Sequence, residues 1–337
     1  MDSTAYERDN VMTLLLLFLS AAFNAPSPTS PPTADTHPTV IVVVGAEGSA
    51  EYAPEFARSA DRWAAAAKQA SAKYLEVGRD TSNKDDDKSH FKSLIDQEVA
   101  KDAAPLWLVL IGHGTFDGRD AKFNLRGPDV SDQELADWLK PCRRRLAVID
   151  CSSSSAPFLN KLSGANRVII TATQSGQEIH FARFGDQMSA AIADPAADLD
   201  KDGQTSLLEA YLAASHRVEE FYKQNGRLAT EHALIDDNGD ARGTPASWFQ
   251  GLRATRAAKD GTPLDGPRAH QWHLVMSATE QAMPPELRAK RDALELKIEA
   301  LRTKKSTLAE ADYYAQLDAL LLELAHLYAS TPATTRP

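Results

Sequence analysis

Apolar runs alternate with amphipathic stretches along the middle of the chain. One short predicted strand, over residues 73–77, is only partly apolar. Four runs are rich in Val, Ile and Leu and are four to six residues long; they span residues 40–44, 106–111, 146–149 and 167–171. Such runs are typical of strands that are buried on both faces of a parallel sheet. They predict a central sheet of that kind.

Longer segments with helical spacing separate these strands. Helices are expected over residues 53–72, 89–101, 131–139, 157–162 and 206–224. Strands that alternate with helices at this pace indicate a mostly parallel sheet covered by helices on both faces. The sequence therefore predicts an α/β fold over residues 39–250.

Two of the predicted strands end in chemically active side chains. The run 106–111 stops at a glycine-flanked His113, and the run 146–149 leads directly to Asp150 and Cys151. Neighbouring parallel strands would release both residues into the crevice where open α/β sheets carry out their chemistry. A thiolate nucleophile beside an imidazole is a Cys/His dyad. Taken singly, such residues are more often an inert strand-end histidine and a small buried cysteine, so the prediction depends on the pair.

This order of elements resembles the catalytic core of the legumain-like cysteine peptidases, relatives of the caspases, metacaspases and gingipains. The resemblance implies a caspase-like three-layer α/β/α sandwich and a cysteine endopeptidase that acts on polypeptides. His113 and Cys151 match the family's dyad, and Asp150 stands where an acidic or polar residue usually precedes the nucleophile. Backbone amides near Cys151 and Gly114 would stabilise the oxyanion, with Ser152 also near the site.

One departure concerns the residues after the nucleophile. Relatives often have a glycine there, whereas this chain has four serines, Ser152 to Ser155. The alternative prediction is therefore a catalytically inactive member of the fold that acts as a protein-binding or scaffold module.

The segment after the strand 167–171 resembles, by position, the loop that builds the family's primary specificity pocket. The predicted substrate contacts are Thr173, Ser175, Glu178 and His180. A polar surface loop is the alternative interpretation. Glu178 or Asp186 in the pocket would favour a basic P1 residue, and Arg183 would favour an acidic one.

A calcium-binding loop of the EF-hand kind is predicted over residues 198–209. Oxygen-bearing side chains occupy five of its ligand positions, the carbonyl of Gln204 occupies another, and Gly203 provides the turn. The side-chain ligands are Asp198, Asp200, Asp202, Ser206 and Glu209. The competing explanation for the last two is a capping box that opens a helix. A bound Ca²⁺ would be structural, and the chemistry itself would need no cofactor.

The chain begins with an apolar run, residues 11–23, that is too short to span a bilayer comfortably. We interpret residues 1–25 as a signal peptide or N-terminal anchor, and 26–38 as a Pro-rich linker. The residues before the run are net acidic, which is unusual for a signal peptide. The predicted location is periplasmic or extracellular, with an uncleaved membrane tether as the alternative.

Charge and cysteine content narrow the possible functions. The formal net charge is −10, which argues against a general nucleic-acid or anionic-membrane surface. The two cysteines, Cys142 and Cys151, provide no disulfide framework. An extended segment between them would hold them too far apart for a bridge, so Cys151 is expected to be free.

The C-terminal part is expected to be separate from the sheet. Residues 251–283 are predicted as an irregular connector, with one late strand over 271–276. Leucines at alternating three- and four-residue spacing predict a helical hairpin over 284–329. Packing on the core is the default for this hairpin; self-association or binding of a protein partner are the alternatives.

Overall fold

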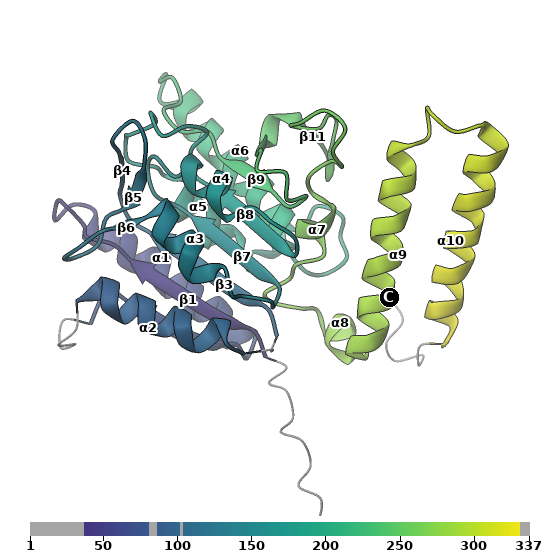
Figure 1. Cartoon of the computed structure of the whole chain (residues 1–337), viewed down its shortest axis with the longest axis horizontal. Helices are drawn as coiled ribbons and strands as arrows, with labels where there is room; N and C mark the ends of the chain where they lie inside the picture. The colour runs from purple at the N-terminus through teal and green to yellow at the C-terminus, as the bar shows by residue number, and fades with distance from the viewer. Residues whose placement is uncertain (1–36, 81–85, 102–103, 331–337) are drawn as a thin grey trace, which may run out of the picture. The chain divides into compact units, whose positions relative to one another are not determined.

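The computed structural model describes residues 37–80, 86–101 and 104–330. Its centre is a seven-stranded sheet (Figure 1). In spatial order the strands are β10 (Thr244–Pro245), β9 (Leu234–Asp236), β8 (Arg167–Thr171), β7 (Leu146–Asp150), β3 (Leu106–Ile111), β1 (Thr39–Val44) and β2 (Lys73–Val77). The five strands from β8 to β2 pair in parallel, and β9 pairs antiparallel with both β8 and β10. The signal peptide or anchor and nearly all of the predicted linker lie outside the described residues.

Helices cover both faces of this sheet. On one face, called the α1 face, the core is completed by α1 (Ala53–Gln69), α5 (Phe184–Ala191) and α6 (Leu207–Gln224). On the other, the α2 face, it is completed by α2 (Asp87–Val99), α3 (Asp132–Leu139) and α4 (Ala156–Leu162). The three-layer α/β/α sandwich predicted from the alternating pattern is therefore confirmed.

The central strands explain the continuous apolar runs. Every residue of β1, β3 and β7 is buried, because these strands have a neighbour on each side and a helical layer on each face. Capping boxes are present at Ser131 and Ser206, at the amino ends of α3 and α6; the second is the one named in the sequence analysis.

Short elements fill the connections. A small antiparallel sheet, made of β4 (Gly114–Phe116), β5 (Ala121–Phe123) and β6 (Val130–Ser131), follows β3 directly. Beyond β10 lie β11 (Phe249–Gln250), β12 (Arg253–Ala254), α7 (Pro267–His270) and α8 (Ala278–Ala282). The predicted late strand over 271–276 is wrong. Within the described part of the chain, its only strand pairing is an isolated bridge between His273 and Ser206, since this segment crosses the start of α6 instead of extending the sheet.

The predicted helical hairpin consists of α9 (Pro285–Thr303) and α10 (Glu310–Ser330), which are antiparallel (Figure 1). Leu294, Ile298 and Leu301 form the buried stripe of α9. The Arg291 guanidinium binds the Glu280 carboxylate of α8 at 2.6 Å. Among the described residues, no helix has the length and apolar character needed to cross a membrane.

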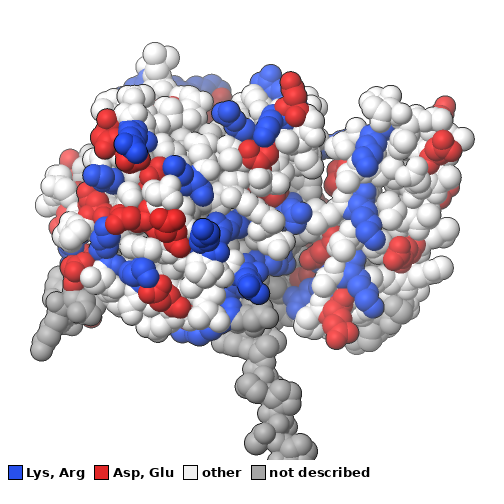
Figure 2. Space-filling view, in the orientation of Figure 1, with Lys and Arg blue, Asp and Glu red and all other residues white. Residues whose placement is uncertain are grey.

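Acidic and basic side chains are interspersed on the face shown in Figure 2, without a broad field of one sign. Many of them are engaged in ion pairs. Glu98, for example, is almost fully buried beneath Arg144, Lys73 and Lys101. The two lysines hold the pKa of its carboxyl at about 2, overcoming the effect of burial.

Candidate functional site

The candidate dyad lies at the carboxyl ends of β3 and β7. These strands are neighbours in parallel register, with Leu110 opposite Asp150. Side chains alternate between the faces of a strand, and Ile111 and Ile149 both lie in the core of the α1 face. Cys151 lies in that same core, two residues after Ile149.

His113 also faces the α1 layer. Its ring packs against Tyr52, Phe56 and Phe181, with centroids 4.7, 5.4 and 5.7 Å away. Its Nε2 atom lies 3.1 Å from the carbonyl oxygen of Glu47. Because a carbonyl only accepts, this contact assigns the hydrogen to Nε2 and leaves Nδ1 with a free lone pair in the neutral ring.

Cys151 is covered in this conformation. Cys151 is only 3% exposed, and its backbone amide donates a hydrogen bond to the carbonyl of Leu110 at 2.9 Å. Burial first, then the nearby Asp150 and Glu231 carboxylates, raise the pKa of the Cys151 thiol well above its ordinary value. Among the described residues, Cys151 Sγ makes no hydrogen bond to His113. The sulfur is therefore a neutral thiol here, as free cysteines in apolar surroundings usually are.

Asp150 points to the opposite face from Cys151, because adjacent residues of a strand alternate. Its Oδ1 accepts hydrogen bonds from the Ser152 amide (3.0 Å) and hydroxyl (2.6 Å), while its buried Oδ2 has no partner. Burial raises the pKa of the Asp150 carboxyl to about 7. These two predicted near-site residues thus form a buried pair of their own.

The four serines after Cys151 are all buried and form a tight turn, with Ser154 at a φ of 57°. The Gly114 amide donates to Ser153 Oγ at 3.2 Å, and the Ser154 amide donates to the carbonyl of Glu178 at 2.9 Å. The amides predicted to stabilise an oxyanion, those of Cys151, Gly114 and Ser152, are therefore all paired internally. An oxyanion would require some of these bonds to open.

The predicted specificity loop is mostly held by internal contacts. Thr173 is buried, and its hydroxyl binds Ser155 and the Ala156 amide. Glu178 binds His232, with 2.5 Å between Oε1 and Nδ1. Ser175 is half-buried and His180 is exposed, so these two are open to contact.

The charges that could select a P1 residue are likewise engaged. Asp186 is paired with Arg58 and Arg62 of α1, at 3.0 and 2.8 Å. The Arg183 guanidinium lies 4.2 Å from the centre of the Phe221 ring. The geometry leaves both P1 alternatives of the sequence analysis open.

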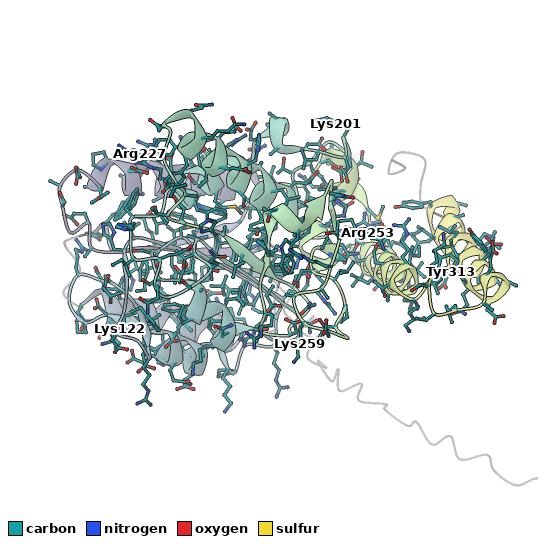
Figure 3. The ribbon with its side chains drawn as sticks, turned by 90° about the horizontal axis from the view of Figure 1, so that it is seen from above. Lys122, Lys201, Arg227, Arg253, Lys259 and Tyr313 are labelled. Atoms are coloured by element: carbon teal, nitrogen blue, oxygen red, sulfur yellow. The ribbon has the colours of Figure 1, made fainter. Side chains whose placement is uncertain are left out.

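The acidic side chains of the predicted calcium loop lie close together. Carboxylate oxygens of Asp198, Asp200 and Asp202 lie within 4.8 Å of one another, in the loop marked by Lys201 in Figure 3. Two further predicted ligands, Ser206 and Glu209, make the capping box. Gln204 accepts a hydrogen bond from the Ser277 amide through its side-chain oxygen, which still leaves its backbone carbonyl as the predicted ligand.

One residue near this loop was missed by sequence reasoning. His270 Nε2 lies 2.9 Å from Asp200 Oδ2, and His270 groups with Asp200 and Glu209 as a possible set of metal ligands. Glu209 Oε1 accepts from the amides of Leu199 and Asp200, so this carboxylate closes the loop even without an ion. A separation of 70 residues leaves no local signal that could have found His270.

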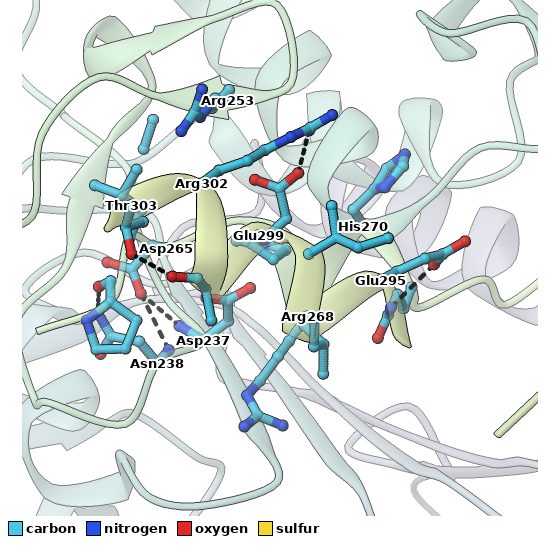
Figure 4. A pocket seen from close by; sticks show the side chains of 18 of the residues that line it. Asp237, Asn238, Arg253, Asp265, Arg268, His270, Glu295, Glu299, Arg302 and Thr303 are labelled. Atoms are coloured by element: carbon cyan, nitrogen blue, oxygen red, sulfur yellow. Dashed lines mark hydrogen bonds and ion pairs between the residues drawn. The ribbon is translucent and has the colours of Figure 1, made fainter. Parts of the chain in front are cut away.

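A cavity of about 600 Å³ lies away from the dyad (Figure 4). Its walls come from the 252–271 segment and from the hairpin, and its floor includes two buried aspartates, Asp237 and Asp265. Burial raises the pKa of both carboxyls. Their oxygens are occupied by backbone amides and the Thr244 hydroxyl, so they serve to join this segment to the sheet edge.

Comparison with known proteins gives similarity in structure only. No protein-family model matches the chain, and no curated protein sequence matches it. Solved structures similar to it include the initiator caspase Dronc of Drosophila (13% identity, TM-score 0.40, covering 59% of this chain and 79% of Dronc). Caspase-1 of Spodoptera frugiperda (10%, 0.40, 64% and 91%) and drICE (11%, 0.36, 61% and 89%) are others.

These values carry no argument about activity. The three-layer α/β/α sandwich rests on the strand order and helical layers of this chain. Membership of the legumain-like peptidases stays a prediction.

Proposed function

We propose that the protein is a cysteine endopeptidase that uses His113 and Cys151. The observation that carries the proposal is their placement: both follow adjacent parallel strands at the carboxyl edge of the sheet, and both side chains face the α1 layer. Such an edge is where open α/β sheets place their reacting groups. The buried serine turn that follows Cys151 fixes the backbone directly after the proposed nucleophile.

The chemistry follows from these two side chains. Cys151 Sγ attacks the scissile carbonyl carbon, and its proton passes to His113 Nδ1, the ring nitrogen with the free lone pair. His113 then returns the proton to the leaving amine as the C–N bond breaks. Water, activated by the same imidazole, hydrolyses the thioester and regenerates the thiol. Because Sγ is buried and neutral, substrate binding must displace the segment that covers it.

The test is hydrolysis of fluorogenic peptides that vary at P1 among Arg, Lys, Asn and Asp, by the full chain and by Cys151→Ser. We expect cleavage with at least one P1 residue, loss of it in Cys151→Ser, and retention in the matched control Cys142→Ser. A folded wild-type protein that cleaves none of these peptides would favour the alternative, an inactive scaffold protein.

We also propose that the 198–209 loop binds Ca²⁺. Three aspartates whose oxygens lie within 4.8 Å of one another repel each other unless a cation or protons neutralise them. Hard carboxylate oxygens are the ligands that Ca²⁺ prefers, with Glu209 available to close the shell. The ion would cross-link the loop between α5 and α6.

Calcium is expected to raise the melting temperature. Binding at about 100 times the dissociation constant stabilises a protein by about 2.7 kcal/mol, which corresponds to several degrees. Differential scanning calorimetry with calcium or with a chelator should show this shift for the wild type and for the control Asp260→Asn, and not for Asp200→Asn. A wild-type melting temperature unaffected by the chelator would contradict the site.

A further inference from the structure

We propose that Glu231 is a positioning residue that holds the amino-terminal turn of α5 against Cys151 and so controls access to the sulfur. The catalytic consequence rests on the proposed peptidase function, whereas the control of access is a property of the thiol alone. Three sets of contacts around residues 183–186 support this role.

The first set joins Glu231 to the start of α5. Glu231 is only 3% exposed. Its two carboxylate oxygens accept hydrogen bonds from the backbone amides of Arg183 and Phe184, each at 2.9 Å. The first amides of a helix have no partner within the helix. The N-cap residue Arg183 provides no side-chain cap, so this distant carboxylate provides it, where the helix dipole favours negative charge.

The second set joins α5 to the sulfur. Gly185 follows the two capped amides, and a methyl group placed on it would lie 2.7 Å from Cys151 Cβ and 3.4 Å from Sγ. The backbone of this turn therefore packs directly on the nucleophile, and glycine is required for the close approach. An electrophile can reach Sγ only when the turn moves.

The third set shows what would stay in place. The Tyr222 hydroxyl donates a hydrogen bond to Glu231 at 3.0 Å and holds the carboxylate toward the turn. Separately, Asp186 of α5 forms ion pairs with Arg58 and Arg62 of α1. The body of α5 is thus anchored independently of Glu231. Loss of the carboxylate would release residues 183–185 and leave the remaining contacts of the helix intact.

The experiment measures alkylation of the full chain by iodoacetamide under native conditions, with Cys151 and Cys142 quantified separately by peptide mass spectrometry. We expect Glu231→Gln to alkylate at Cys151 about tenfold faster or more. The variant keeps one neutral acceptor oxygen and places its NH2 group against the second backbone amide, so the charge-assisted bonds are lost. Tyr222→Phe should give a smaller increase. Cys142 should react at an unchanged rate in both variants, and Glu219→Gln on the exposed side of α6 is the matched control.

An unchanged Cys151 rate in Glu231→Gln would overturn the proposal. So would a parallel rise at Cys142, because that indicates general loosening of the fold. Alkylation needs no peptide substrate, so a protein without peptidase activity can still pass or fail this test.

Discussion

Replacing His113 with alanine is expected to lower kcat/KM for peptide hydrolysis by about 10²- to 10⁴-fold, the range for loss of a general acid–base group. The reason is that the Cys151 thiol is neutral in this structure and needs a base at the moment of attack. His113 is the histidine that faces the same layer from the neighbouring strand. The measurement is steady-state hydrolysis of the best P1 substrate.

The control is His216→Gln, which changes an exposed histidine of α6. It should hydrolyse peptides like the wild type. Because the His113 ring packs on three aromatic rings, His113→Gln should be compared as well, with the melting temperature of each variant recorded. Full activity in folded His113→Ala would rule out the dyad.

Gly114→Ala is expected to destabilise the protein by about 2 to 4 kcal/mol, because it drives a methyl group into backbone. The added carbon would lie 2.1 Å from the carbonyl oxygen of Ser153 and 3.2 Å from that of Lys122. Neither atom is the end of a flexible side chain, so the serine turn and the start of β4 must separate. Denaturant unfolding measures the loss.

Gly164→Ala is the matched control, since its new methyl group would meet only the Arg167 side chain at 3.7 Å or more. Its unfolding free energy should stay within about 0.5 kcal/mol of the wild type. If Gly114→Ala were as stable as Gly164→Ala, the close packing of the serine turn on Gly114 would be wrong.

The sheet could be predicted from the sequence because its strands are buried on both faces. The runs 106–111 and 146–149 contain almost only apolar residues, so both could be recognised as strands and their ends could be located. The positions of His113 and Cys151 at the strand ends followed from this. The capping box at Ser206 was evident because it is a four-residue pattern, a serine followed three residues later by a glutamate.

Contacts between distant segments could not be predicted in this way. The carboxylate that caps α5 lies 47 residues beyond Phe184, and nothing near Glu231 marks it as a cap. The cover over Cys151 depends on Gly185, whose role appears only when the helix is packed on the strand end. The segment 271–276 has an apolar strand-like pattern, yet it crosses the start of α6, because tertiary packing overrides the local strand preference.

The most direct test of the dyad is covalent trapping of Cys151. Cys142→Ser protein is incubated with peptidyl acyloxymethyl ketones carrying Arg, Lys, Asn or Asp at P1, and the adduct is located by intact mass and peptide mapping. We predict one adduct, on Cys151, formed at a rate that falls sharply in the additional variant His113→Ala. No adduct with any P1 residue, or an equal rate without His113, would contradict the account.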